Sequence, residues 1–391
     1  MSSASPASEP ALRTTPLTPA HIVAGARMAE FAGYSMPVQY REGVLKEHLW
    51  TRAHAGAFDV SHMGPAYLTL AARTGEGQAD HEAVAALIEP LVSADVRGLK
   101  PGQVRYALLL APDGGILDDL MIGRPFAPQV QGMLQFVVNA GTKQADFALI
   151  AAATEGRATL ERADESALIA VQGPDAAAVV AALLPPAADM SFMTLRWLDY
   201  EGHGLAVTRS GYTGEDGYEI LVPAALAPAF WDRLLADARV RPIGLGARDS
   251  LRLEAGLPLY GHDLDETVSP VEANLAFALS RRRRKAVDFP GSARILRELA
   301  SGPARLRVGL RVLEGAPARE GAQIADANGV PVGVVTSGGF SPTLGAGVAM
   351  GFVPPELSAP GARLKVIVRG KAQAAEVTAL PFVPHRYVRQ A

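Results

Sequence analysis

Apolar and polar residues alternate in several short segments before about residue 300, and glycine or proline bounds most of them. This period of two is typical of half-buried strands, because successive side chains point to opposite faces of a sheet. Between these segments lie amphipathic stretches with helical spacing, two of which open with a proline that favours the first turn of a helix. The predicted strands are 66–70, 105–110, 134–139, 167–172, 205–209 and 218–222, and the predicted helices are 44–55, 142–153, 174–184 and 228–238.

These strands and helices do not alternate steadily, which favours an α+β fold with antiparallel sheets over a doubly wound fold. The pattern changes at about residue 300, near Ser301-Gly302-Pro303. Beyond it, Gly/Pro turns separate short strands, as is typical of a small all-β barrel or jelly roll. The predicted strands of this C-terminal domain are 306–312, 332–336, 348–352, 364–368 and 373–378.

Composition narrows the possible functions. The 391 residues are 49% hydrophobic and 20% charged, which excludes disordered and fibrous classes. Lysine plus arginine number 37 against 40 acidic residues, so the formal net charge of −3 gives no electrostatic reason to bind nucleic acid or an anionic membrane. The absence of cysteine excludes disulfides, thiolate metal sites and cysteine nucleophiles, so any catalysis must use oxygen or nitrogen groups.

Targeting and membrane signals are also weak. The longest apolar run, 176–184, is far shorter than the roughly 20 residues that a membrane-spanning helix needs. Residues 1–10 are rich in Ser, Ala and Pro, contain Glu9 and lack a basic residue, so they match neither a secretory nor a mitochondrial signal. We expect a disordered tail on a cytoplasmic protein.

Two adjacent acids lie inside a predicted strand. Asp113-Gly114-Gly115 separates two apolar runs and predicts a β-hairpin, so Asp118 and Asp119 point to opposite faces that are otherwise apolar. At least one carboxylate is therefore expected in a dry place, where its pKa rises and it becomes useful for proton transfer. The equally weighted alternative is a hairpin mouth with one solvated acid and one acid paired to an arginine.

A second candidate is the glycine-rich segment 210–219, which leads into a strand. Its glycines could let the backbone approach a ligand closely. Glu219 shares a strand face with Leu221, so an inward carboxylate could accept two N–H groups from a flat heterocycle. The alternative is an ordinary turn with a surface tyrosine.

Segment 244–249 imitates a dinucleotide-binding fingerprint, but Asp249 occupies the last glycine position and 239–242 does not read as a buried strand. We therefore expect neither a nicotinamide nor a flavin cofactor. Arg248 would instead open a helix over 247–255, where it and the helix N-terminus favour an anion or a carboxylate.

Two charged clusters are not expected to bind a ligand. The basic block 281–285 has no interleaved aromatic residues and predicts a solvated loop rather than a nucleic-acid site. His262-Asp263 with Asp265-Glu266 lacks a second histidine, which favours capping or salt bridges over a metal site.

Short motifs then follow one another along nearly the whole chain: Leu12 to Leu17, Phe31 to Tyr40, Phe58 to Gly64, Gly114 to Leu120, Val137 to Ala140, Gln172 to Pro174, Ser210 to Glu219, Gly244 to Asp249, Leu253 to Ala255 and Thr336 to Gly345. One such motif would be weak, but this many at collinear spacing are specific. Together they resemble the glycine cleavage T-protein family of folate-dependent aminomethyltransferases.

The resemblance implies an α+β fold of three domains in a cloverleaf around a central hole that holds folate, with a C-terminal β-barrel. We therefore expect one domain from residues 1–66 and 164–260, a second from 67–163 with 261–300, and the barrel from 301–391.

The resemblance also implies a reaction in which an aminomethyl group on the dihydrolipoyl arm of the H-protein passes its one-carbon unit to tetrahydrofolate and releases ammonia. Neither a metal nor a flavin nor a nicotinamide is implied. Asp119 falls at the catalytic carboxylate, where it would orient the attacking amine and support a transfer state of cationic character. The implied folate contacts are Met63, Tyr106, Asn139, Tyr212, Glu219, the site-lining Arg248, and Arg389 or Arg386 near the glutamate tail.

Tyr34, Gly123, Leu257 and Ser280-Arg281 depart from the family's usual residues, which predicts weaker stacking on folate. The folate-binding assembly factors of the same fold carry a Lys-Gly-Cys motif that this chain lacks. The related demethylases carry a flavin domain for which 391 residues leave no room. Two alternatives stay open, namely a paralogue that acts on another N-methyl or aminomethyl donor and a non-catalytic folate-binding module.

Overall fold

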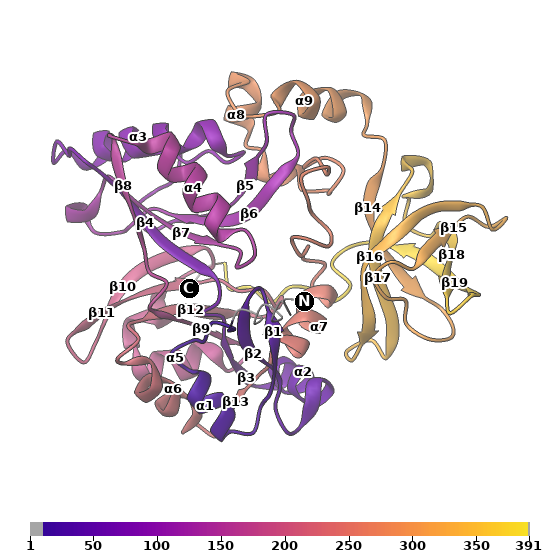
Figure 1. Ribbon diagram of the computed structural model, residues 1–391, viewed down its shortest axis with the longest axis horizontal. Coiled ribbons are helices and arrows are strands. Elements are labelled where there is room, and N and C mark those ends of the chain that lie inside the picture. Colours follow the sequence, from indigo (N-terminus) through magenta and orange to yellow (C-terminus); the bar gives the residue numbers. More distant parts are fainter. Residues whose placement is uncertain (1–10, 390–391) are drawn as a thin grey trace, which may run out of the picture.

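The computed structural model describes residues 11–389, and Figure 1 shows three lobes, each built around its own sheet. The disordered tail expected at 1–10 lies outside the described residues. We call the lobes the first lobe, the second lobe and the barrel. No helix within residues 11–389 is both long and apolar enough to cross a membrane.

The first lobe contains a six-stranded sheet in the order β10-β11-β12-β9-β3-β13, in which only the β13–β3 pair is parallel. Its core is packed around Trp231, Phe230 and Tyr218, which are each at most 2% exposed. The strands are β3 (Ala55–Asp59), β9 (Ala167–Gln172), β10 (Thr194–Tyr200), β11 (His203–Arg209), β12 (Gly217–Val222) and β13 (Val240–Pro242).

Helices and a separate two-stranded sheet complete the first lobe. They are β1 (Arg27–Phe31), β2 (Tyr34–Gln39), α1 (Thr18–Val23), α2 (Gly43–Ala53), α5 (Ala176–Leu183), η3 (Pro185–Asp189), α6 (Ala227–Leu235) and α7 (Leu245–Glu254).

The second lobe contains a five-stranded antiparallel sheet in the order β5-β6-β7-β4-β8. Its apolar core includes Leu68, Phe136 and Ile150, which α3 and α4 help to cover. The elements are β4 (Gly64–Leu70), α3 (Gly77–Ile88), η1 (Glu89–Leu91), β5 (Val104–Leu110), β6 (Ile116–Gly123), η2 (Pro128–Val130), β7 (Met133–Val138), α4 (Lys143–Thr154) and β8 (Ala158–Arg162).

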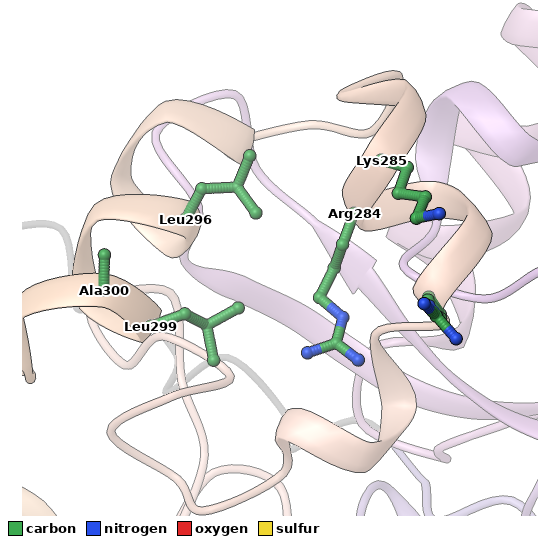
Figure 2. A pocket seen from close by; sticks show the side chains of 6 residues that line it. Arg284, Lys285, Leu296, Leu299 and Ala300 are labelled. Atoms are coloured by element: carbon green, nitrogen blue, oxygen red, sulfur yellow. The ribbon is translucent and has the colours of Figure 1, made fainter.

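A connecting segment with η4 (Ala276–Ala278), α8 (Arg281–Ala286) and α9 (Ser292–Ser301) leads to the barrel. The prediction of a loop at 281–285 is wrong, because these residues form α8, but Arg281, Arg284 and Lys285 are exposed, as predicted. Ser280 caps α8 by accepting from the Arg283 N–H, and the fully buried Arg283 side chain forms ion pairs with Glu89 and Asp288. Figure 2 shows a groove between α8 and α9 that is lined by Arg281, Arg284, Lys285, Leu296, Leu299 and Ala300.

The C-terminal strands form a closed barrel in the order β14-β17-β16-β15-β18-β19, and β14 also pairs with β19 to close it. Closure leaves no open sheet edge in this lobe. The elements are β14 (Leu306–Val312), β15 (Gln323–Ala325), β16 (Pro331–Ser341), β17 (Ala346–Val353), η5 (Pro355–Leu357), β18 (Arg363–Val368) and β19 (Lys371–Thr378).

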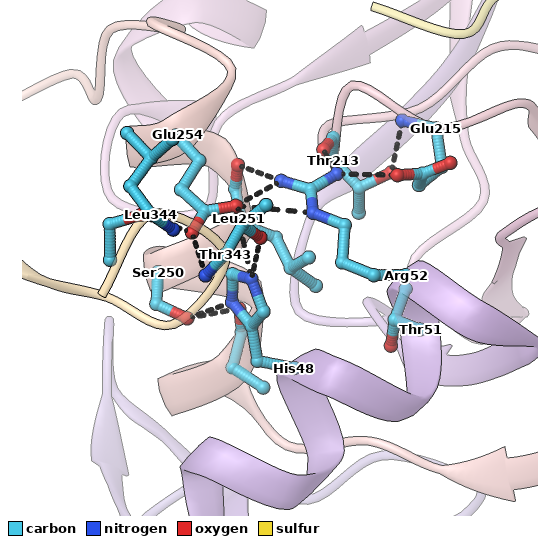
Figure 3. Close-up of polar contacts among 12 residues, drawn as sticks. His48, Thr51, Arg52, Thr213, Glu215, Ser250, Leu251, Glu254, Thr343 and Leu344 are labelled. Carbon is cyan, nitrogen blue, oxygen red and sulfur yellow. Dashed lines mark hydrogen bonds and ion pairs between the residues drawn. The ribbon is translucent and has the colours of Figure 1, made fainter. Parts of the chain in front are cut away.

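A buried polar cluster joins the barrel to the first lobe, as Figure 3 shows. The Glu254 carboxylate on α7 accepts from Arg52 Nη2 at 2.8 Å and lies 3.0 Å from His48 Nε2, both on α2. Thr343, in the turn between β16 and β17, donates its backbone N–H and its hydroxyl to the same carboxylate. A second acid, Glu215, accepts from Arg52 Nη1 at 2.8 Å. The cluster fixes the β16–β17 hairpin of the barrel against the first lobe.

The predicted α+β class, antiparallel sheets and C-terminal barrel are confirmed, with β13–β3 as the parallel exception. Every strand and helix predicted above overlaps an observed element. Strands β1, β2, β3, β8, β10, β13 and β15 and helices α1, α3 and α9 were not predicted. The expected division into three domains at the boundaries given above stays a prediction.

Candidate functional site

The β5–β6 hairpin places the two adjacent acids. It is antiparallel, with Asp118 opposite Leu109 and Asp119 opposite Leu108, as the Asp113-Gly114-Gly115 turn predicts. Burial alternates along β6, so that Asp118 is fully buried, whereas Asp119 is only partly buried and lies on the opposite face. The expectation of a carboxylate in a dry place is confirmed for Asp118.

Two predicted site residues contact Asp119 directly. The Tyr106 hydroxyl on β5 donates to Asp119 Oδ2 at 2.9 Å. Asn139, which follows β7, donates through Nδ2 to Asp119 Oδ1 at 2.7 Å. The same amide also donates to Asp118 Oδ1 at 2.8 Å, and the Asn139 backbone N–H donates to Asp118 Oδ2 at 3.0 Å. The structure therefore brings Tyr106, Asp119 and Asn139 together.

Within the described part of the chain, neither acid on β6 has a basic side chain at ion-pair distance. Burial, and then the negative charge of Asp118, raise the pKa of Asp119 to about 7, although hydrogen bonds from Tyr106 and Asn139 oppose the rise. Burial and the Asp119 charge raise the pKa of Tyr106 well above its usual value, so this phenol stays a hydrogen-bond donor. Asp119 can accordingly gain and lose a proton near neutral pH.

A second set of candidate site residues lies on the first lobe. The guanidinium of Arg248, in the first turn of α7, lies 4.9 Å from the centre of the Tyr212 ring, and the Tyr212 hydroxyl donates to the carbonyl of Pro258. Glu219 on β12 is partly buried and accepts from the Ser210 hydroxyl at 3.2 Å. Its charge acts on Arg248, whose pKa is nonetheless lowered by burial.

Two buried donors or acceptors in this region have no partner within the described residues, namely Arg248 Nη1 and His62 Nδ1. Burial lowers the pKa of His62 to about 3, and the charges of Arg248 and Lys143 add to that, whereas Asp59 opposes it. His62 is thus a neutral imidazole. Since unpaired buried polar atoms cost free energy, their presence here favours a ligand that would satisfy them.

The second set of candidate residues interacts electrostatically with the Asp119 carboxylate. Burial raises the pKa of Tyr212, and the Asp119 charge contributes to the rise, so Tyr212 lies within electrostatic range of Asp119. The Phe277 ring stacks on Tyr106 at a centroid distance of 5.9 Å and is 73% exposed. The region therefore offers a large aromatic surface beside a titratable carboxylate.

The other residues predicted to contact folate lie away from the Asp119 carboxylate. Met63 is partly buried in the apolar cluster between the two sheets, and its carbonyl accepts from Lys143 Nζ at 3.3 Å. Arg389 is exposed, with its guanidinium 5.8 Å from the centre of the Phe192 ring. Arg386 is held by Glu215 at 3.4 Å. No direct contact joins any of these three side chains to Asp119 among the described residues.

Two local expectations need correction. Gly211 and Gly217 do approach another group closely, but that group is Gln172, since a Cβ on either would lie within 2.5 Å of its amide. A short edge strand, β13, does precede Gly244, and Val240 in it is buried. The helix predicted over 247–255 is α7.

The acidic cluster at 262–266 and one of the departures, Tyr34, also have structural roles. His262 pairs with Glu320 and Asp263 with Arg252, as the salt-bridge interpretation predicts. Lys143 Nζ donates to the Tyr34 hydroxyl at 2.8 Å, so this departure takes part in a buried lysine site. No group of His, Cys, Asp and Glu within residues 11–389 has the arrangement of a metal site.

Sequence reasoning missed His62, Phe277 and Asp146, and the charge of Asp146 contributes to the raised pKa of Asp118. His62 stands inside a quoted motif, and its unpartnered nitrogen becomes visible only in the fold. Phe277 gives a weak signal as an aromatic in a Gly/Pro-poor loop. The Arg248 charge acts on His62, the Glu219 charge acts on Arg248, and the Asp119 charge acts on Tyr212, which makes these carboxylates, this guanidinium and this imidazole the candidate polar groups of the site. These groups complement a flat heterocycle that has both N–H donors and acceptors.

Comparisons with known proteins agree on one family. A family model described as the GCVT N-terminal domain matches residues 17–283, and the glycine cleavage T-protein C-terminal barrel domain matches residues 305–384.

Individual relatives cover almost the entire chain. The probable mitochondrial aminomethyltransferase of Schizosaccharomyces pombe is 42% identical over 98% of this chain and 96% of its own length. The mitochondrial aminomethyltransferase of Homo sapiens is 43% identical over 96% of this chain and 91% of its own length. The crystal structure of glycine cleavage system aminomethyltransferase T from Bartonella henselae superposes with a TM-score of 0.88 at 42% identity, covering 96% of this chain and 99% of that one.

Proposed function

Because the chain belongs to the glycine cleavage T-protein family, we propose that it is an aminomethyltransferase of the glycine cleavage system. It transfers the one-carbon unit from the aminomethyl-dihydrolipoyl arm of the H-protein to tetrahydrofolate and releases ammonia. Tetrahydrofolate, when bound, supplies the amine that accepts this unit. A cytoplasmic location stays a prediction from the sequence, and the curated relatives named above are mitochondrial.

A single observation carries the proposal: among residues 11–389 the Asp119 carboxylate has no cation at ion-pair distance, it accepts from Tyr106 and Asn139, and its pKa is about 7. A carboxylate that has no resident positive charge can lower the energy of positive charge that develops on a substrate. A pKa near neutrality also lets it take and return a proton during the departure of ammonia. Tyr106 and Asn139 fix its orientation.

Recognition of the pterin ring follows from the second set of candidate site residues. We assign Glu219 to accept N–H groups of the ring, with Tyr212 and Met63 as neighbouring contacts. Arg248 offers its unpartnered Nη1 to an acceptor on the ligand. We place Arg389 at the glutamate tail because the guanidinium is exposed and can meet a carboxylate.

The test is ammonia release from aminomethylated H-protein by the purified chain. We expect release that depends on tetrahydrofolate, and we expect the same lipoyl group to become free dihydrolipoyl. Small N-methyl and aminomethyl compounds, which are the donors of the alternative paralogue, serve as the comparison. Turnover of those donors without any turnover of aminomethylated H-protein would contradict the proposal.

A further inference from the structure

The groove between α8 and α9 shares no lining residue with the candidate functional site. Its α8 wall is basic and is formed by Arg281, Arg284 and Lys285. Its α9 wall is apolar and is formed by Leu296, Leu299 and Ala300. Figure 2 shows the Arg284 side chain extending into the space between the two helices, with Leu299 on the opposite side. The two walls of the groove therefore differ in chemistry.

Each wall is one face of a helix. The three basic residues occupy positions i, i+3 and i+4 of α8, and the three apolar residues have the same spacing on α9. Residues at this spacing are neighbours on one side of a helix. We call the basic face of α8 the cationic stripe and the apolar face of α9 the apolar stripe.

The cationic stripe has no acidic partner within residues 11–389, and all three of its members are exposed. The two arginines between its members are used differently. Arg283 is fully buried and its Nε lies 2.7 Å from Asp288 Oδ1, and the Nε of Arg282 lies 2.8 Å from Asp95 Oδ1. These pairs anchor α8 in the fold, so that the charges of the cationic stripe stay available on its other side.

The apolar stripe belongs to a helix that is anchored from beneath. Ile295 is 0% exposed in the core under α9, and Leu296 and Leu299 are partly buried against the same core. The carbon surface that remains exposed on these leucines lines the groove, together with Ala300. Covering such surface with another apolar group is favourable, because it removes the surface from water.

The two stripes together define the chemistry of a partner. A partner that covers both must bring carboxylates to α8 and apolar side chains to α9. An amphipathic helix meets this requirement, because its apolar residues recur at i, i+3 and i+4 along one face and its charged residues flank them. Nucleic acid fits less well, because the groove has no aromatic side chain on which a base could stack. A bilayer also fits less well, because its surface is broad and the apolar stripe is one wall of a groove.

We propose that the groove between α8 and α9 is a docking site for an acidic amphipathic helix of a partner protein. The apolar face of that helix packs on the apolar stripe, and its acidic edge pairs with the cationic stripe. Charge complementarity steers the encounter and fixes the orientation, while the apolar contact contributes to affinity. Docking requires neither folate nor Asp119, so it is independent of the proposed transferase activity.

The test uses the full chain and a fluorescein-labelled peptide of about 14 residues, long enough for roughly four helical turns. This probe carries leucines at i, i+3 and i+4 with glutamates along one edge. The control peptide has the same composition in an order that removes both faces. We expect fluorescence anisotropy to show that the probe binds at least about 10-fold more tightly than the control. Absence of probe binding, or equal affinity of the two peptides, would overturn the proposal.

Three single substitutions locate the binding. Arg284→Glu reverses a charge in the cationic stripe, and Ala300→Glu places an acid in the apolar stripe. Arg297→Glu is the matched control, because Arg297 is an exposed residue of α9 that does not line the groove. We expect the first two to weaken probe binding at least about 5-fold and the control to change it less than about 2-fold. Equal weakening by Arg297→Glu would overturn the proposal. All three positions are exposed, and circular dichroism checks that each variant is folded.

Competition against the bound probe identifies the class of partner. Unlabelled peptide, oligouridylate and vesicles that contain phosphatidylserine are compared at equal salt. We expect the unlabelled peptide to displace the probe at the lowest concentration. More effective displacement by the oligonucleotide or by the vesicles would overturn the proposal in favour of a nucleic-acid or membrane surface. None of these measurements requires turnover, so failure of the chain to release ammonia would contradict only the proposed function.

Discussion

Two carboxylates in this molecule, the buried Glu254 and the partly buried Asp119, have opposite electrostatic surroundings. Glu254 is fully buried among donors, with Arg52 at 2.8 Å and His48 at 3.0 Å. Burial alone would raise its pKa, but the hydrogen bonds and charge of His48, with hydrogen bonds from Ser341 and Thr343, lower the pKa to about 2. Asp119 has two neutral donors and an acidic neighbour, and its pKa is raised to about 7.

The contrast distinguishes a carboxylate that stabilises the fold from a carboxylate that is available for catalysis. A carboxylate that is surrounded by donors is permanently ionised and holds elements together, which is what Glu254 does between α2, α7 and the barrel. A carboxylate that lacks a cation keeps its negative potential available for a substrate, at a cost in stability.

The largest effect is expected on activity. Asp119→Asn removes the charge and the titratable proton but keeps the size and part of the acceptor geometry. We expect turnover to fall by roughly 10²–10⁴-fold while tetrahydrofolate affinity changes little. Steady-state ammonia release and calorimetric folate titration measure the two quantities. A fall in affinity that accounts for the whole loss of activity would make Asp119 a binding residue only.

The next effect concerns stability. Glu254→Ala leaves Arg52 and His48 without their shared acceptor, and breaking a buried ion pair in this way costs about 3–5 kcal/mol of unfolding free energy. Glu376→Ala is the matched control, because its partner Arg363 is 65% exposed and such surface pairs contribute less than about 1 kcal/mol. Urea unfolding of both variants measures the difference. Equal destabilisation by the two substitutions would show that the cluster in Figure 3 does not stabilise the contact between the barrel and the first lobe.

The same cluster has a pH signature. The folded pKa of Glu254 is about 2, below its ordinary value of 4.5, so its stabilisation is complete above pH 4.5 and is lost as the pH falls toward 2. Wild type should lose more stability over this interval than Glu254→Ala does.

The smallest effect is expected on affinity. Glu219→Ala should weaken tetrahydrofolate binding by about 1–3 kcal/mol, the cost of leaving charged hydrogen bonds unmade. Glu219→Gln keeps the side-chain shape beside Ser210 and separates loss of charge from loss of packing. Calorimetric titration of both variants measures the affinity, and wild-type affinity in Glu219→Ala would remove this residue from the pterin site.

Local sequence determined much of what could be predicted. The Asp113-Gly114-Gly115 turn and the alternation around it were enough to predict the β5–β6 hairpin and the opposite orientation of its two acids. The barrel followed from short strands between turns, because each strand carries its own period of two. These features depend on neighbours within a few residues.

Features that depend on distant partners were not predictable in this way. Arg283 belongs to a basic block that suggests exposure, but Glu89 pairs with it from almost two hundred positions away in the chain. Glu254 meets Arg52 across a similar separation. Asp146 lies in a correctly predicted helix, but its burial to 2% exposure depends on how α4 packs in the fold. Burial of a charge is decided by such long-range partners and not by the local pattern.

The central claim is that Asp119 acts as a titratable carboxylate in the transfer reaction, and the pH dependence of activity tests it most directly. The rate of tetrahydrofolate-dependent ammonia release, as kcat/KM for aminomethylated H-protein, should be measured from pH 5.5 to 8.5 for wild type and Asp119→Asn. Because the pKa of Asp119 is raised to about 7 and the ionised form is the active one, we expect wild-type kcat/KM to rise with pH through about 7. Asp119→Asn should be slower throughout and should lack this rise. A variant that keeps the wild-type rate and the same pH dependence would contradict the account.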